Sequence, residues 1–123
     1  MDRVDHRPRL FILEIEPKAA ARPRFYRGRV HTEPKYKEWQ IRCEQLLRPM
    51  WRGDPLEKVK RMEILFIGAN RRMDIDNCIK SVLDVCVSCG VLRNDNLAVL
   101  DSISANYHHT KDQDPCIIVK IFD

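Results

Sequence analysis

The chain has 123 residues, of which 44% are apolar and 33% are charged, so it has the size of one ordinary domain and the composition of neither a disordered tail nor a membrane protein. Its apolar runs are far shorter than the ~20 residues that cross a bilayer, and its charged N-terminus lacks the apolar stretch of a signal peptide; we therefore expect one soluble, cytoplasmic domain over residues 1–123 with no membrane partner. The formal net charge is only +4, from 22 Lys and Arg against 18 Asp and Glu, so the placement of the basic residues says more than their number.

The first predicted element is a strand over Arg9–Glu16, where apolar and acidic residues alternate before Pro17. The following stretch, Lys18–Glu33, has no helical period and is predicted to be a functional loop or a loose hairpin around Phe25 and Tyr26. Basic residues are concentrated in and just after it, interrupted by a single acid; they are Lys18, Arg22, Arg24, Arg27, Arg29, Lys35 and Lys37. This segment indicates a polyanionic partner.

A helix is predicted to begin at Pro34, with Thr32 or Glu33 near its N-cap, and to end before Pro49. Its apolar residues recur at three- and four-residue steps and are Tyr36, Trp39, Cys43, Leu46 and Leu47.

The second half of the chain is predicted to form an interior strand, a helix and two further strands. The interior strand covers Lys58–Ile67, and the helix runs from Asp74 or Asp76 to Cys89, with Gly90 as its terminating residue. The last strands are predicted over Leu97–Tyr107 and Cys116–Phe122. The resulting order β-α-β-α-β-β predicts an α+β fold with two layers, in which two helices pack on one mixed sheet.

Acidic residues and a lysine gather in the sequence at the junction between the interior strand and the second helix. Asp74 and Asp76 are two residues apart, and Lys80 follows Asp76 by one helical turn. A helix cap with an ordinary ion pair would explain one of these acids, but not both together with Asp95 in the polar loop that follows the helix. Hard oxygen ligands of this kind suit Mg²⁺ or Mn²⁺.

These residue types can together cleave a phosphodiester. Metal ions generate the attacking hydroxide and neutralise charge, and a lysine beside them can orient water or stabilise the transition state. The basic segment, together with Arg71 and Arg72, would bind the remaining phosphates, and Phe25 and Tyr26 could stack on unpaired bases. We therefore predict an Mg²⁺-dependent nuclease with catalytic residues Asp74, Asp76, Lys80 and Asp95.

At these positions the chain resembles the RusA-type Holliday junction resolvases, small endodeoxyribonucleases often encoded by phages and prophages. The resemblance rests on Arg22-Pro-Arg-Phe25, on Arg72-x-Asp74-x-Asp76-Asn77-x-x-Lys80, on Asp84 in the following apolar helix, and on Asp95. It implies a bacterial or phage-encoded homodimer that binds a four-way junction and nicks two strands symmetrically in DNA recombination and repair. It also implies that Asp74, Asp76 and Asp95 hold Mg²⁺, for which Mn²⁺ can substitute, while Lys80 assists.

The sequence departs from the family where two adjacent acids are usual, because Asn94 precedes Asp95. Asp101 is a spare carboxylate, either a further ligand or an acid exposed by a bend. The plain interpretation of Asp84 is an ion pair with Lys80, one turn away.

Three alternatives remain at the level of sequence. The first is a nuclease for other branched DNA, such as flaps or forks. The second is a non-catalytic nucleic-acid-binding module in which the aspartates are helix caps. The third is a zinc site made by Cys86, Cys89 and the pair His108-His109, although both thiols fall within a helical pattern, which favours two buried small hydrophobic residues instead.

Overall fold

One four-stranded sheet, in the order β1-β6-β4-β5, organises the protein. The computed structural model describes residues 7–21, 24–31 and 33–123, and the strands of this sheet are β1 (Arg9–Leu13), β4 (Arg61–Gly68), β5 (Ile103–His109) and β6 (Cys116–Phe122). β6 runs antiparallel to β1 and to β4, whereas β4 and β5 are parallel. The predictions of a mixed sheet and of an interior strand, β4, are confirmed.

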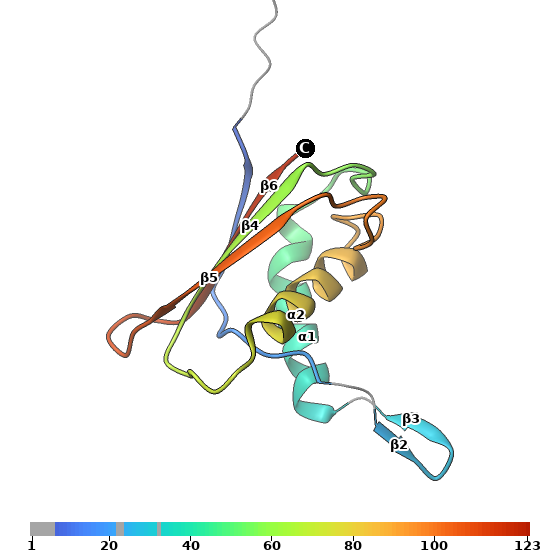
Figure 1. The fold of residues 1–123 in the computed structure, drawn as a ribbon, viewed down its shortest axis with the longest axis vertical. Coiled ribbons are helices and arrows are strands. Elements are labelled where there is room, and N and C mark those ends of the chain that lie inside the picture. The colour runs from blue at the N-terminus through green and yellow to red at the C-terminus, as the bar shows by residue number, and fades with distance from the viewer. Residues whose placement is uncertain (1–6, 22–23, 32) are drawn as a thin grey trace, which may run out of the picture.

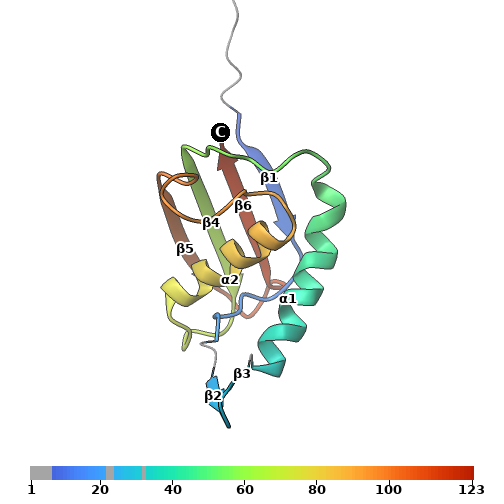
Figure 2. The same cartoon turned by 90° about the vertical axis from the view of Figure 1, so that its right-hand side faces the viewer.

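Two helices, α1 (Pro34–Leu47) and α2 (Ile75–Ser88), lie on the same face of this sheet, and a short 3-10 helix, η1 (Arg48–Met50), follows α1 (Figures 1 and 2). Trp39 and Cys43 from α1, Val82 from α2, and Phe66 and Ile117 from the sheet are almost fully buried and belong to one core cluster. The predicted two-layer α+β fold is confirmed. None of the helices in the described part of the chain is long and apolar enough to cross a membrane.

The start of α1 follows from its capping residue. The Glu33 carboxylate accepts hydrogen bonds from the backbone N–H groups of Lys35 and Tyr36, at 3.2 and 2.9 Å, which satisfies two of the donors that a helix start leaves open. Pro34 occupies the first turn, where its missing N–H costs nothing. Glu33 is thus the cap, and the other candidate, Thr32, lies outside the described residues.

α2 connects the parallel strands β4 and β5, so its first turn lies just beyond the end of β4. Its buried stripe includes Cys78, Val82, Val85 and Cys86. The helix ends where Gly90 adopts a φ of +74°, a left-handed conformation that glycine adopts without a steric penalty. The predicted terminating role of Gly90 is confirmed.

The basic loop forms a hairpin of β2 (Arg24–Tyr26) and β3 (Arg29–His31) that projects away from the sheet and helices (Figure 1). Arg27 and Gly28 form its turn with φ values of 51° and 73°, as in the two-residue turns that match strand twist. The predicted hairpin is confirmed over these residues, while Arg22 lies outside the described residues.

Three predicted strands are shorter in the structure. β4 begins at Arg61 rather than at Lys58, because the chain bends at Lys60 and Val59 forms only an isolated bridge with Leu100. β1 stops at Leu13, because the Ile15 N–H bonds back to the Leu13 carbonyl at 2.8 Å and turns the chain. β5 begins only at Ile103, because Asn96 organises a turn: its backbone carbonyl accepts from Val99 N–H and its side chain from Ala98 N–H, both at 3.1 Å. The predicted strand over Leu97–Tyr107 was therefore wrong for its first six residues.

Candidate active site and nucleic-acid interface

Asp74 and Asp76 stand at the start of α2, beyond the end of β4. Asp74 is the N-cap residue, but its side chain makes no capping hydrogen bond. The Asp76 carboxylate lies in the first turn and accepts from the Asn77 N–H at 2.9 Å. Both residues are exposed, and negative charge is favourable at a helix N-terminus. The capping role that could have explained Asp74 is therefore not performed by its carboxylate.

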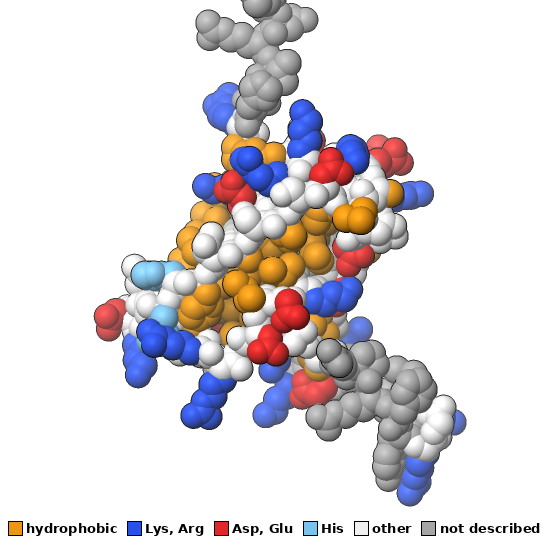
Figure 3. Space-filling view, in the orientation of Figure 1, with side chains coloured by type: hydrophobic (Ala, Val, Ile, Leu, Met, Phe, Trp, Pro, Cys, Tyr) orange, Lys and Arg blue, Asp and Glu red, His pale blue; other side chains and the backbone are white. Residues whose placement is uncertain are grey.

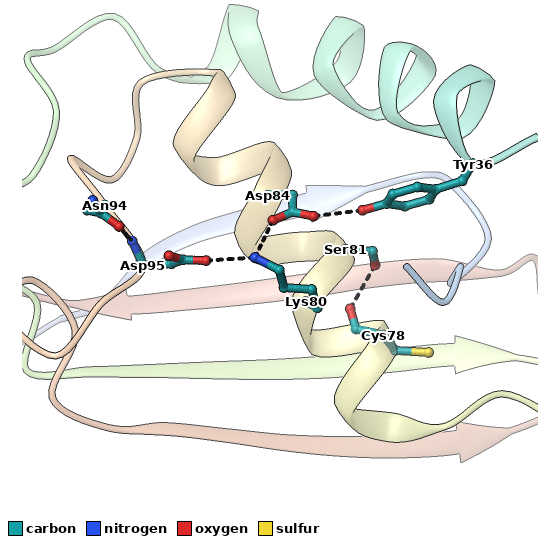
Figure 4. A network of polar contacts seen from close by, with 7 residues as sticks. All are labelled: Tyr36, Cys78, Lys80, Ser81, Asp84, Asn94 and Asp95. Carbon is teal, nitrogen blue, oxygen red and sulfur yellow. Dashed lines mark hydrogen bonds and ion pairs between the residues drawn. The ribbon is translucent and has the colours of Figure 1, made fainter. Parts of the chain in front are cut away.

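Lys80, one turn further along α2, lies between two carboxylates (Figure 4). Its Nζ is 2.8 Å from Asp84 Oδ1 and 3.2 Å from Asp95 Oδ2. The hydrogen bonds to Asp84 and Asp95 raise the pKa of Lys80 above its ordinary value, so the side chain remains an ammonium at neutral pH. The predicted ion pair between Asp84 and Lys80 is confirmed, and Asp95 joins the same group from fifteen residues further along the chain.

Asp95 reaches Lys80 because the loop after α2 is fastened to a distant segment. The Leu56 N–H bonds to the Val91 carbonyl and the Arg93 N–H bonds to the Leu56 carbonyl, both at 2.9 Å. Asn94 accepts from the Asp95 N–H through its side chain at 2.7 Å. Asn94, which replaces the expected second acid, thus helps to shape the loop that presents Asp95.

Tyr36 also belongs to this network, although its spacing in the sequence predicts only an apolar position of α1. Its hydroxyl donates to Asp84 Oδ2 at 2.9 Å, and the residue is 4% exposed. Burial raises the pKa of Tyr36, and the neighbouring Asp84 raises it further. The available signal was chemical, since a buried tyrosine hydroxyl usually needs a hydrogen-bond partner.

The three predicted metal ligands have suitable chemistry but are not gathered into one group. Carboxylate oxygens suit a hard divalent cation, and the exposed Asp74 and Asp76 take part in none of the ion pairs among the described residues. Within those residues, no group of three or more His, Cys, Asp or Glu side chains is placed to hold a metal ion. Asp95 would have to share its carboxylate between Lys80 and the metal, so the three-aspartate site stays a prediction.

Comparison with known protein families matches most of the chain to one family. The sequence profile of the family Endodeoxyribonuclease RusA matches residues 14–122, which include every residue of the group around Lys80. The chain belongs to the RusA family. Crossover junction endodeoxyribonuclease RusA from Aquifex aeolicus (strain VF5) is 39% identical over 71 residues, which span 57% of this chain and 56% of that protein. The matched region therefore covers little more than half of the relative's length.

Between the start of α2 and the ends of β4 and β5 there is a hollow of about 430 Å³, lined in part by Phe66 and Tyr107. Met73 and Ile75, the two neighbours of Asp74, also line it. Tyr107 donates through its hydroxyl to the Asn70 carbonyl at 2.7 Å. The hollow lies beside Asp74. It was not predictable from the sequence, because it forms only when β4 and β5 pair.

The basic residues predicted to bind DNA are distributed over three places. Arg24, Arg27 and Arg29 belong to the hairpin, and Lys35 and Lys37 are exposed in the first turn of α1 that follows it. Arg71 and Arg72 are exposed in the loop before α2. In Figure 3, basic side chains surround the end of the sheet and helices from which the hairpin projects, and acidic side chains over α2 lie among them.

The loop arginines have local partners. The Arg71 guanidinium lies 2.9 Å from His109 Nδ1, and the Arg72 backbone N–H donates to the Asn70 side chain at 2.9 Å. Both residues remain exposed, so their side chains are accessible to a ligand.

Two secondary expectations are resolved by the structure. Cys86 is buried and Cys89 packs against the core, and the arrangement of the described residues gathers no zinc-binding group from them and the two histidines. Asp101 is exposed before β5 begins and pairs with Lys58 at 2.7 Å, which favours the interpretation as an exposed acid over that as a further ligand.

Proposed function

We propose that this member of the RusA family is a metal-dependent endodeoxyribonuclease that resolves four-way (Holliday) junctions by paired symmetric nicks. The observation that carries the proposal is the contact between Lys80 and Asp95, on the helix that begins with Asp74 and Asp76. Carboxylates that can hold a metal ion, with a lysine beside them, can together hydrolyse a phosphodiester. The name of the Aquifex relative, a crossover junction endodeoxyribonuclease, supports the same substrate.

The proposed cofactor is Mg²⁺, with Mn²⁺ able to substitute, held by Asp74, Asp76 and Asp95. When bound, such an ion would activate water and neutralise charge on the attacked phosphate. Lys80 would donate to a phosphate oxygen or to the attacking water, because its raised pKa keeps it protonated. The catalytic set is therefore proposed to be Asp74, Asp76, Lys80 and Asp95.

We propose that the basic residues hold the junction by its phosphates. The proposed DNA-binding residues are Arg22, Arg24, Arg27, Arg29, Lys35, Lys37, Arg71 and Arg72. Their contacts would be independent of base sequence and strongly dependent on salt. They would place the DNA across the start of α2, since the hairpin and the loop before α2 flank that region.

Paired nicks call for two active sites, and one chain supplies one group of catalytic residues. A four-way junction has approximate two-fold symmetry, and a two-fold homodimer would present its two sites to opposite strands. We therefore propose a homodimer that acts on branched DNA in the cytoplasm of a bacterium, whether its gene is bacterial or phage-borne.

The proposal is tested with a synthetic four-way junction, a flap and a linear duplex, each incubated with Mg²⁺, Mn²⁺ or EDTA. We expect symmetric nicks in the junction with either metal and none in EDTA. Binding to all three substrates without any cutting would leave a binding module and refute the nuclease. Faster cutting of the flap than of the junction would refute the assignment as a resolvase.

A further inference from the structure

Lys80 cannot hold a fixed position by itself. A lysine side chain is a flexible four-carbon stem that ends in a compact charge, and the Lys80 side chain is 54% exposed. An ion pair at such exposure contributes little to the stability of the fold. What the two carboxylates can provide is position, because contacts to Asp84 and Asp95 from different sides restrict where the Nζ atom can lie.

The two carboxylates are not equivalent. Asp95 belongs to a loop, and in the proposed function its oxygens also bind the metal. Asp84 lies on α2 itself, one turn from Lys80, and the proposed chemistry makes no other use of it. Its two oxygens have different partners, with Oδ1 facing Lys80 and Oδ2 accepting from Tyr36 (Figure 4).

Tyr36 is itself rigidly held. Its ring is buried and stacks on Trp39, with ring centroids 6.2 Å apart and an interplanar angle of 15°. The Trp39 indole N–H in turn donates to the Glu16 backbone carbonyl at 2.7 Å. The Tyr36 hydroxyl, which orients Asp84, is therefore held in place by the packing of the buried face of α1.

We propose that Asp84, anchored by Tyr36, is a positioning residue that holds the Lys80 ammonium beside Asp95, and this rests on the catalytic role proposed for Lys80. Asp84 touches neither the substrate nor the metal in this proposal. It acts on the reaction only through Lys80. Groups that orient a reacting side chain typically change rates by roughly 10- to 100-fold when they are removed.

The test uses Asp84→Asn in the full chain. An asparagine can still accept the Tyr36 hydrogen bond through its oxygen, but it then presents an NH₂ group to the Lys80 ammonium, which needs an acceptor. We expect the single-turnover rate of junction cutting to fall roughly 10- to 100-fold, with the junction Kd in EDTA unchanged. Tyr36→Phe removes only the anchoring hydroxyl and should slow cutting by a smaller factor.

A matched control removes a comparable contact between the same two helices. Ser88 on α2 donates to the Glu44 carboxylate on α1 at 3.0 Å, away from Lys80. Ser88→Ala removes this hydrogen bond and should therefore cut at the wild-type rate. Thermal unfolding of all the variants checks that the rates compare folded proteins.

Two further measurements separate positioning from a merely structural role. In a Lys80→Ala background, Asp84→Asn should cause no additional loss of rate, because the group on which Asp84 acts is already absent. In the uncomplexed protein, NMR relaxation at the Lys80 Cε should show a more mobile side chain in Asp84→Asn and in Tyr36→Phe than in the wild type. This second measurement does not depend on any cutting.

The outcomes are distinct. If the wild type cuts and Asp84→Asn cuts equally fast, or if its Lys80 Cε is as rigid as in the wild type, the positioning role is overturned while the proposed function stands. A loss of junction affinity that accounts for the whole loss of rate would also overturn the positioning role. If the wild type cuts no DNA, the proposed function fails, and the relaxation measurement still decides whether Asp84 positions Lys80.

Discussion

Asp76→Asn offers the sharpest separation of catalysis from binding and folding. The substitution keeps the size of the side chain, and its amide oxygen can still accept from the Asn77 N–H, as the carboxylate does at 2.9 Å. The residue is exposed, so the main cost to the fold is the loss of a negative charge at the N-terminus of α2. That loss costs less than about 1 kcal/mol, or a few degrees in Tm.

The expected effect on cutting is far larger. If Asp76 holds the metal as proposed, its loss should cost roughly 10²- to 10³-fold in rate, because the metal stabilises the negative charge that develops on the phosphate. Junction binding in EDTA should be unchanged or tighter, because a negative charge near the DNA phosphates has been removed. The assays are single-turnover cutting of a labelled junction, gel-shift titration and thermal unfolding.

Asp101→Asn is the control, because Asp101 is an exposed acid that pairs with Lys58 away from α2. It should cut at the wild-type rate. The role given to Asp76 would be refuted if Asp76→Asn cut the junction normally. Weaker binding that accounts for the whole loss of rate would refute it equally.

Three further predictions concern the fold and the DNA interface. Gly90→Ala should destabilise the protein by roughly 1–2 kcal/mol in urea unfolding, because alanine is strained at a φ of +74°. Crowding adds nothing to this cost, since the nearest atom to the added Cβ is a Pro55 side-chain atom at 3.9 Å. An unchanged unfolding midpoint would contradict the strain argument. The hydrogen bond from Arg42 lowers the pKa of Glu16. The pair should therefore stabilise the fold at pH values above the pKa of an unfolded glutamate, and this stabilisation should be lost as the pH falls through the lower pKa of the folded state. The effect is small at this exposure, and Arg42→Ala should abolish it when the free energy of unfolding is measured from pH 7 to pH 3. Arg29→Ala, in the hairpin, should weaken binding of all DNA substrates alike and reduce the slope of log Kd against log salt by about 1; an unchanged slope would exclude a phosphate contact there.

The helices were predictable because their signals are local. Proline at a first turn, an acidic cap and glycine at a terminus act within a few residues, and they placed α1 and α2 to within a residue or two. β6 was also predicted with its bounds. The early end of β1 and the late starts of β4 and β5 were missed, because each depends on a turn or bend of the backbone, at Ile15, Lys60 and Asn96, that alternation of side chains does not reveal.

The candidate site was predictable as a set of residue types and less so as a set of contacts. Spacing along α2 placed Asp84 one turn from Lys80, and the structure confirms that pair. The arrival of Asp95 depends on how the loop after α2 is fastened to Leu56, a contact between distant segments. Tyr36 could not be assigned to the site from the sequence, because nothing local indicates that its hydroxyl meets a residue 48 positions away.

The short distance along the chain between the basic hairpin and Tyr36 has a consequence for protein engineering. β3 ends at His31, Glu33 caps α1, and Tyr36 lies in the first turn of that helix. Exchanging the hairpin between relatives to alter DNA preference would therefore also risk changing the position of Tyr36, and with it the site around Lys80. A graft that shifts the cap by one residue would rotate Tyr36 about 100° around the helix axis and withdraw its hydroxyl from Asp84. Chimaeras should therefore be joined before Glu33, with the first turn of α1 kept intact.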